Sequence, residues 1–123
     1  MTLDEIFKEK SSQIEIPEPS VDRLKRKYVN VANVHTSGKL SEEDLGRVIT
    51  IRPGYTTNMG KVHGYYALGR PIQKGVIFDI YVSQTINAFY FPSTEFRSSL
   101  GRFLLRLVEN GYRINTIEFK LKS

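Results

Sequence analysis

The sequence predicts an α+β protein in which a small antiparallel β-barrel, or a strongly bent sheet, has one amphipathic helix packed on it. Short runs of β-branched and aromatic residues between positions 46 and 92 are separated by glycine and proline, as in small barrels and sandwiches. A stripe of apolar residues at helical spacing follows them. The length of 123 residues fits one domain.

An acidic N-terminal arm and linker are predicted for residues 1–20, ahead of a single domain over residues 21–123. Thr2 and Glu5 have the spacing of a capping box, which predicts a short helical arm. Two prolines near the end of this segment disfavour helix, so we expect the linker to be extended.

A second short helix is predicted to begin after Ser20, whose hydroxyl can cap it, and to end near Tyr28. Val21 and Leu24 share one side of this helix with Tyr28. The apolar period then changes to two, which predicts a strand over residues 29–34.

The remaining strands are read from β-branched and aromatic runs that end at turn residues. A turn at Ser37-Gly38 and a helical turn over 41–45 separate the first strand from the others. The predicted strands cover residues 48–51, 62–68, 76–82, 86–91 and 114–121.

The C-terminal helix is predicted from six apolar residues that form one continuous stripe. Ser93 or Thr94 can cap its N-terminus, and Gly111 can end it in the left-handed conformation. Arg102 and Arg106 are four residues apart and are expected on the outer face. The stripe consists of Phe96, Leu100, Phe103, Leu104, Leu107 and Val108.

Three segments of the β-rich part resemble the SH3-like small barrel. They are the Gly-x-Val-x-Ile strand that opens at Gly46, the Gly60-Lys61-Val62 segment and the strand over residues 76–82. The likeness covers roughly residues 45–97 and is similar to that of KOW-type RNA-binding modules, with residues 87–93 as the last barrel strand. It implies a binding module more often than an enzyme. An OB-like barrel is the alternative.

The charge of the chain is uneven. The formal net charge is +5, but residues 1–22 carry −4 and residues 46–123 carry +7. A basic body favours a polyanionic partner, most simply nucleic acid. The chain has no cysteine, no run of apolar residues long enough for a membrane span and no signal-peptide layout at its N-terminus. We therefore expect a basic cytoplasmic protein with no membrane contact.

Basic and aromatic residues alternate over two predicted strands and their loops. This combination is typical of proteins that bind single-stranded DNA or RNA, because the basic side chains neutralise phosphates and the aromatic rings stack on nucleobases. Tyr65 and Tyr66 are consecutive and point to opposite faces of a strand, so one ring is expected at the surface. The predicted phosphate contacts are Arg52, Lys61, Arg70 and Lys74, and the predicted stacking rings are Tyr55 and Tyr65 or Tyr66.

Two other functions remain open at the level of the sequence. A small protein-interaction module, such as a regulator, inhibitor or assembly subunit, would dock on a larger partner and could self-associate through an edge strand. A small hydrolase would need Asp79 with His63, although Asp79 is better explained as facing solvent or pairing with an arginine across the sheet. His35 and His63 have no carboxylates at metal-ligand spacing, so no metal and no cofactor are expected.

Overall fold

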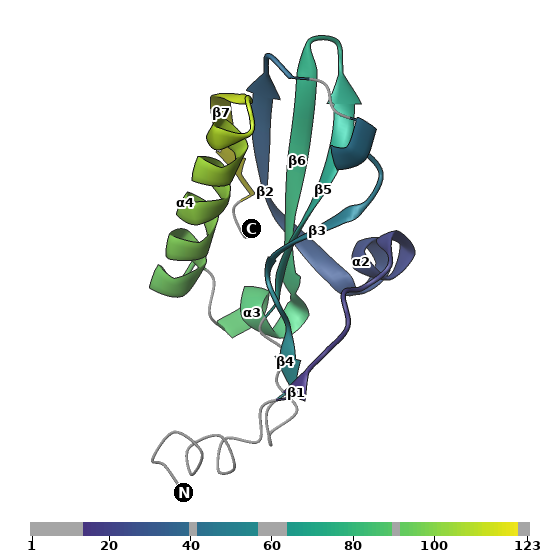
Figure 1. Ribbon diagram of the computed structural model, residues 1–123. Helices are drawn as coiled ribbons and strands as arrows, with labels where there is room; N and C mark the ends of the chain where they lie inside the picture. The colour runs from purple at the N-terminus through teal and green to yellow at the C-terminus, as the bar shows by residue number, and fades with distance from the viewer. Residues whose placement is uncertain (1–13, 40–41, 57–63, 90–91, 121–123) are drawn as a thin grey trace, which may run out of the picture.

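The protein is an α+β structure built on one five-stranded antiparallel sheet with the strand order β3-β5-β6-β2-β7 (Figure 1). The computed structural model describes residues 14–39, 42–56, 64–89 and 92–120. The strands of this sheet are β2 (Tyr28–Ser37), β3 (Val48–Arg52), β5 (Tyr65–Ile72), β6 (Gly75–Ser83) and β7 (Arg113–Phe119).

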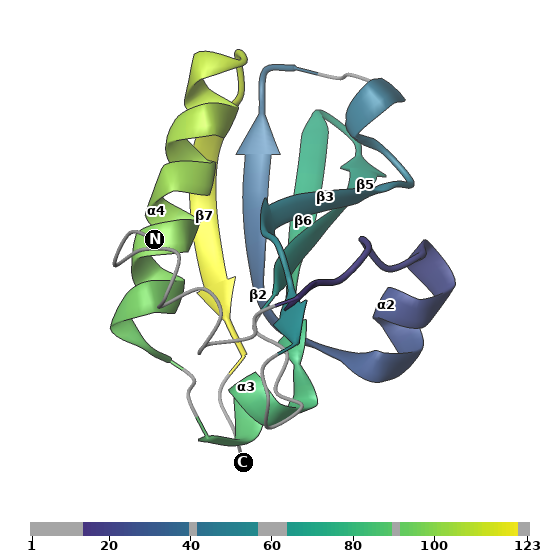
Figure 2. The ribbon, with the colours of Figure 1, turned by 60° about the horizontal axis from the view of Figure 1, so that its bottom comes forward.

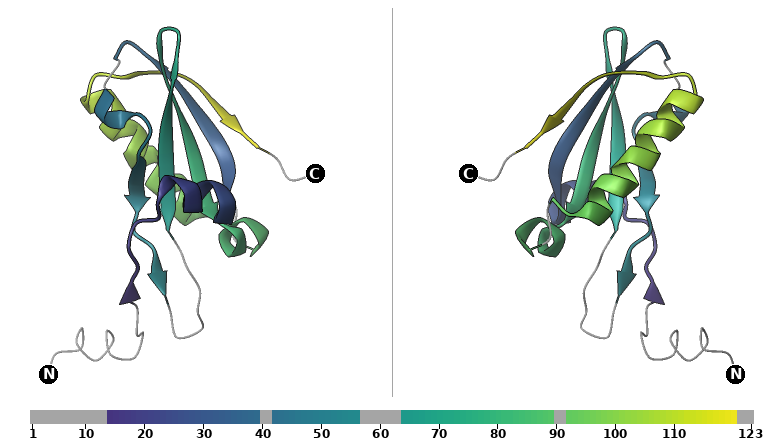
Figure 3. Two further views of the ribbon diagram at one scale, coloured as in Figure 1. Left: turned by 90° about the vertical axis from the view of Figure 1, so that its right-hand side faces the viewer. Right: turned by 90° about the vertical axis from the view of Figure 1, so that its left-hand side faces the viewer.

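The sheet is bent but does not close. Strands β3 and β7 lie at its two edges and do not pair with each other, so of the two predicted architectures the closed barrel is wrong. A separate two-stranded ladder, β1 (Ile14–Glu15) with β4 (Tyr55–Thr56), projects beyond one end of the sheet (Figure 3). The predicted helical arm over residues 2–11 lies outside the described residues.

Helix α2 (Val21–Lys27) forms as predicted, because Ser20 caps it: the Ser20 hydroxyl accepts a hydrogen bond from the Arg23 N–H. The helix buries Leu24 against one face of the sheet, in a small cluster with Val48, Tyr66 and Leu68. The 3-10 turn η1 (Glu42–Asp44) falls within the predicted helical turn.

Helix α4 (Thr94–Glu109) covers the opposite face of the sheet and runs beside β7 (Figures 1 and 2). Ser93 caps its N-terminus, and Gly111 has a φ of 101°, the left-handed conformation that glycine adopts without strain. Phe96, Leu100, Phe103 and Leu107 are buried as predicted. Val108 was assigned to the same stripe, but it is 52% exposed, because the helix turns this position away from the sheet.

The predicted strand over residues 86–91 is wrong, because residues Gln84–Phe89 form the short helix α3. The hydroxyl of Ser83, the last residue of β6, accepts a hydrogen bond from the Ile86 N–H at 3.1 Å and so starts the helical turn. Ile86 is buried in the core under α4. Capping and burial therefore outweigh the β-rich composition of this segment, of which residues 90–91 lie outside the described part.

No helix in the described part of the chain is long and apolar enough to cross a bilayer.

Candidate anion-binding groove

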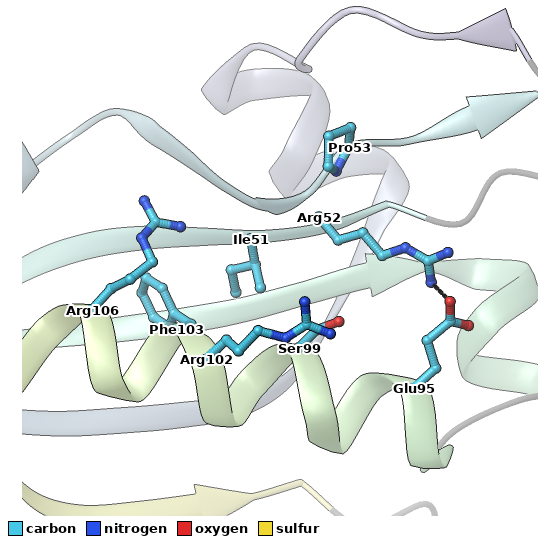
Figure 4. A pocket seen from close by; sticks show the side chains of 8 residues that line it. All are labelled: Ile51, Arg52, Pro53, Glu95, Ser99, Arg102, Phe103 and Arg106. Atoms are coloured by element: carbon cyan, nitrogen blue, oxygen red, sulfur yellow. Dashed lines mark ion pairs between the residues drawn. The ribbon is translucent and has the colours of Figure 1, made fainter.

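A groove of about 430 Å³ lies between the edge strand β3 and helix α4 (Figure 4). Apolar side chains form part of its wall, and four charged side chains lie around it. We call it the arginine groove; its lining residues are Ile51, Arg52, Pro53, Glu95, Ser99, Arg102, Phe103 and Arg106.

The α4 side of the groove follows from helical spacing. Ser99, Arg102 and Arg106 are three and four residues apart, so they lie on one flank of the helix. Phe103 is buried between this flank and the sheet, and Ser99 is buried as well. The two arginines that the sequence placed on the outer face therefore lie above the junction between α4 and β3.

The β3 side of the groove depends on a β-bulge. Val48 faces α2, and simple alternation would turn Thr50 and Arg52 to that face as well. The register shifts between Thr50 and Arg52, so that Arg52 is paired with Tyr65, which faces α4. The guanidinium of Arg52 consequently lies 5.6 Å from the centre of the Tyr65 ring, on the side of the groove.

The arginines of the groove differ in their partners. Arg52 forms an ion pair with Glu95, which lies in the first turn of α4 where the helix dipole favours a carboxylate. Arg102 donates a hydrogen bond to the Ser98 hydroxyl at 3.3 Å, and among the described residues neither Arg102 nor Arg106 has a carboxylate partner. The groove thus holds three guanidinium groups and one carboxylate, and two of its positive charges have no carboxylate partner within the described part of the chain.

A second hollow, of about 280 Å³, continues the arginine groove past Phe103 and Arg106. Asp44 lines this hollow and accepts a hydrogen bond from the Tyr112 hydroxyl at 2.6 Å. Burial raises the pKa of Tyr112, and the carboxylate of Asp44 raises it further. Lys39 lies above the same ring, 5.5 Å from its centre, so this hollow contains both signs of charge.

The structure places the three described basic residues of the predicted site, Arg52, Arg70 and Lys74, in different parts of the molecule. Arg52 lies in the arginine groove, whereas Arg70 points to the other face of the sheet and forms an ion pair with Asp79, with Nε and Oδ2 2.8 Å apart. Lys74 is exposed in the turn between β5 and β6, at the far end of the sheet from the β1–β4 ladder (Figure 1). Lys61 and the side chain of Tyr55 lie outside the described part of the chain.

The expectation that either Tyr65 or Tyr66 is at the surface is wrong. Each is 1% exposed, although their rings do point to opposite faces. Tyr65 packs edge-on against Phe96 of α4 at 5.4 Å, and Tyr66 packs edge-on against Tyr28 at the end of α2, also at 5.4 Å. Both faces of β5 are covered by helices here, so neither ring is available for stacking on a base.

Asp79 pairs with an arginine across the sheet, as the sequence analysis favoured. It is 9% exposed, and both of its carboxylate oxygens have partners. Arg70 donates to Oδ2. The side-chain amide of Asn33 donates to Oδ1 at 2.8 Å when its nitrogen is assigned to the position that faces acceptors. This arrangement gives no support to Asp79 as a general base, and His63 lies outside the described residues.

The described residues contain no cluster of three or more possible metal ligands. His35 lies 3.7 Å from Glu118, a single contact in which the histidine is only partly exposed.

Comparisons with known proteins give no family for this chain. No protein-family model matches it, and neither the curated proteins nor the solved structures include a significant match. We therefore infer the function from the geometry of the groove.

Proposed function

We propose that this chain is a non-enzymatic nucleic-acid-binding protein that takes a single strand of DNA or RNA along the arginine groove. The observation that carries the proposal is the pair Arg102 and Arg106. These two guanidinium groups lie one helical turn apart and have no carboxylate partner among the described residues.

Guanidinium groups are suited to phosphate because they can donate two parallel hydrogen bonds to it and stay charged at any physiological pH. Side chains four residues apart on a helix have Cβ atoms about 5–6 Å apart, so Arg102 and Arg106 can bind neighbouring phosphates of one strand. Because the groove is lined by one edge strand and one helix, we expect it to hold one sugar–phosphate backbone. The net charge of +5 adds a long-range attraction to polyanions.

The mode of binding differs from the one expected from the sequence. Because Tyr65 and Tyr66 are buried, the affinity should come mainly from phosphate contacts and depend little on base sequence.

The test is a fluorescence-anisotropy titration with labelled single-stranded DNA, single-stranded RNA and duplex DNA. We expect tighter binding to the single strands, and affinity that falls steeply between about 50 and 200 mM salt. In the double variant Arg102→Gln/Arg106→Gln, the slope of log affinity against log salt should flatten by about 1.4, because each lost phosphate contact on a single strand contributes about 0.7.

A matched control separates the groove from general surface charge. Lys74→Gln/Arg26→Gln removes two positive charges as well, but at the β5–β6 turn and on α2, outside the lining of the groove. It should leave the slope nearly unchanged. Equal effects of the two double variants would mean that binding follows net charge alone, and no binding at low salt would favour the protein-interaction alternative.

Glu95 offers a test in the opposite direction. Its carboxylate pairs with Arg52 and opposes an incoming phosphate. Glu95→Gln leaves Arg52 free for the ligand and raises the net charge of the groove, so the affinity should increase several-fold at low salt. A decrease would show that the ion pair holds Arg52 in a binding-competent position.

A further inference from the structure

The edge strand β7 has a sequence that is complementary to itself. No described strand pairs with its outer edge, since β7 ends the sheet and has only β2 as a neighbour (Figure 2). An open edge of this kind is a template for another strand. We propose that β7 pairs antiparallel with β7 of a second copy of this chain, which joins the two sheets into one across a two-fold axis.

The direction of the backbone groups along β7 follows from one hydrogen bond. The N–H of Lys120 donates to the carbonyl of Val31 in β2 at 2.9 Å. Because successive residues of a strand turn their backbone groups to opposite sides, Phe119 and Ile117 present their N–H and C=O groups to the outer edge. Those groups have no partner strand within the described residues.

A bulge sets the register of the proposed pairing. Thr36 of β2 pairs with Ile114, and His35 pairs with Thr116, so Asn115 is the extra residue. Ile114 and Ile117 therefore face the same side of the sheet, and both pack partly buried against the core under α4. A strand without the bulge would turn these two residues to opposite faces.

One register matches the side chains on both faces of β7. It centres the two-fold axis between Asn115 and Thr116, which places Ile114 opposite Ile117 of the second copy on the α4 face. On the other face, Arg113 then lies opposite Glu118 of the second copy, and symmetry repeats this opposite-charge pair. A shift by one residue would place Ile114 opposite Glu118, which faces the other side of the sheet. Both the Ile114–Ile117 pair and the Arg113–Glu118 pair would then be lost.

The same register accounts for an exposed aromatic residue. Phe119 lies on the α4 face and is 47% exposed. It would lie opposite Tyr112 of the second copy, directly after the end of that copy's α4, where Val108 is exposed. Pairing would cover the exposed side chains of Phe119 and Val108. It leaves the arginine groove free, because the groove lies at β3, the other edge of the sheet.

The first experiment is sedimentation equilibrium over a wide range of concentration. The mass should rise from 14.1 kDa toward twice that value. Arg113→Glu and Glu118→Arg should each weaken the dimer about ten- to thirtyfold, because each places like charges opposite one another at two symmetric positions. The swap Arg113→Glu/Glu118→Arg restores opposite charges and should recover most of the affinity.

The swap separates this register from a general effect of the mutations on β7. A swap variant as weak as the single variants, single variants as strong as the original chain, or a chain that stays monomeric at the highest concentration would each overturn the proposal. Circular dichroism on every variant shows whether the monomer is folded, so that a loss of dimer is not mistaken for unfolding.

A cross-link provides a second measurement that does not depend on affinity. The chain has no cysteine, and Arg113 and Glu118 are too far apart along one strand to be bridged within a chain. Arg113→Cys/Glu118→Cys should therefore form a covalent dimer on oxidation, whereas the two single-cysteine variants should remain largely monomeric on a non-reducing gel. Cross-linking of the single variants to the same extent would contradict this register.

Discussion

The two faces of the sheet are buried in different ways. On one face, the sixteen-residue helix α4 closes an apolar core to which β2, β3, β5 and β6 all contribute buried residues. On the other face, the seven-residue helix α2 contributes one residue to a cluster of four buried residues, the other three of which lie on the sheet. Beyond α2 this second face buries polar residues: Asn33 donates to Asp79, and Asp79 also accepts a hydrogen bond from Arg70.

The difference shows how one strand can contribute apolar side chains to the core on one face and a buried polar side chain to the other. Along β6, Val76, Phe78 and Ile80 point toward α4, whereas Ile77 and Asp79 point the other way. Under a long helix the side chains can be wholly apolar. Where no described helix covers the sheet, a polar side chain is tolerated because its hydrogen bonds are satisfied by neighbours on the adjacent strands. The α4 face should therefore supply most of the stability.

The largest expected effect is at Phe78, in the middle of the α4 face. Its buried ring packs edge-on against Phe103 at 5.7 Å and Tyr112 at 5.3 Å. Phe78→Ala should lower the free energy of unfolding by about 3–5 kcal/mol. Leu24→Ala, in the cluster under α2, should cost about 2–3 kcal/mol, because fewer buried neighbours surround it.

Urea unfolding monitored by circular dichroism measures both values. The exposed Leu105→Ala on α4 is the control and should change stability by less than about 0.5 kcal/mol. A cost at Leu24 equal to that at Phe78 would mean that the small cluster is as important to the fold as the large core.

A smaller effect is expected from the polar network. Asp79→Ala leaves Arg70 and Asn33 without their acceptor and should cost about 1–3 kcal/mol. Arg70→Gln should cost less than about 1 kcal/mol, because the arginine side chain is half exposed and its charge is screened by solvent.

The double variant Asp79→Ala/Arg70→Gln completes a cycle that isolates the interaction between the two side chains. We expect a coupling of a few tenths of a kcal/mol, with most of the cost of Asp79→Ala remaining in the background of Arg70→Gln. A coupling as large as the whole cost would assign the stability to the ion pair, and the Asn33 hydrogen bond would then contribute little.

Local signals in the sequence were sufficient for the helices that have caps. Ser20 and Ser93 each accept the expected backbone hydrogen bond, and Gly111 ends α4 in the expected conformation. Helix α3 was missed because its signals compete: Ile86 favours a strand by composition, and its burial under α4 is a tertiary effect. The sequence left the closed barrel and the open, bent sheet as alternatives, because strand pairing is set by contacts between distant segments.

The site could be predicted only in part, for the same reason. The spacing of Arg102 and Arg106 placed them on one side of a helix, but nothing local indicated that β3 lies beside them. Arg52 reaches the groove through a bulge that shifts the alternation by one residue. Alternation did place the rings of Tyr65 and Tyr66 on opposite faces, but the sequence could not show that a helix covers each face.

The smallest change in the free energy of unfolding at neutral pH is expected from replacing buried tyrosines with phenylalanine. These variants also provide a further comparison of the two faces. Burial raises the pKa of Tyr66 to about 12, and the pKa values of Tyr28 and Tyr81 on the same face are also raised by burial. In the unfolded chain a tyrosine ionises near pH 10. The stability from a neutral, buried Tyr66 is therefore complete below about pH 10 and is lost as the pH rises toward 12, because ionisation then favours the unfolded state.

Tyr66→Phe removes this ionisation and should flatten the loss of stability between about pH 10 and 12, as measured by urea unfolding at a series of pH values. Tyr112→Phe tests the α4 face, where the pKa of Tyr112 is raised by burial and by the Asp44 carboxylate. It should flatten the loss less than the triple variant Tyr28→Phe/Tyr66→Phe/Tyr81→Phe. Each variant is compared with its own stability at neutral pH, so that lost packing or hydrogen bonds do not enter the slope. If Tyr112→Phe alone abolished the alkaline loss, the α4 face and not the α2 face would be the one that limits stability at high pH.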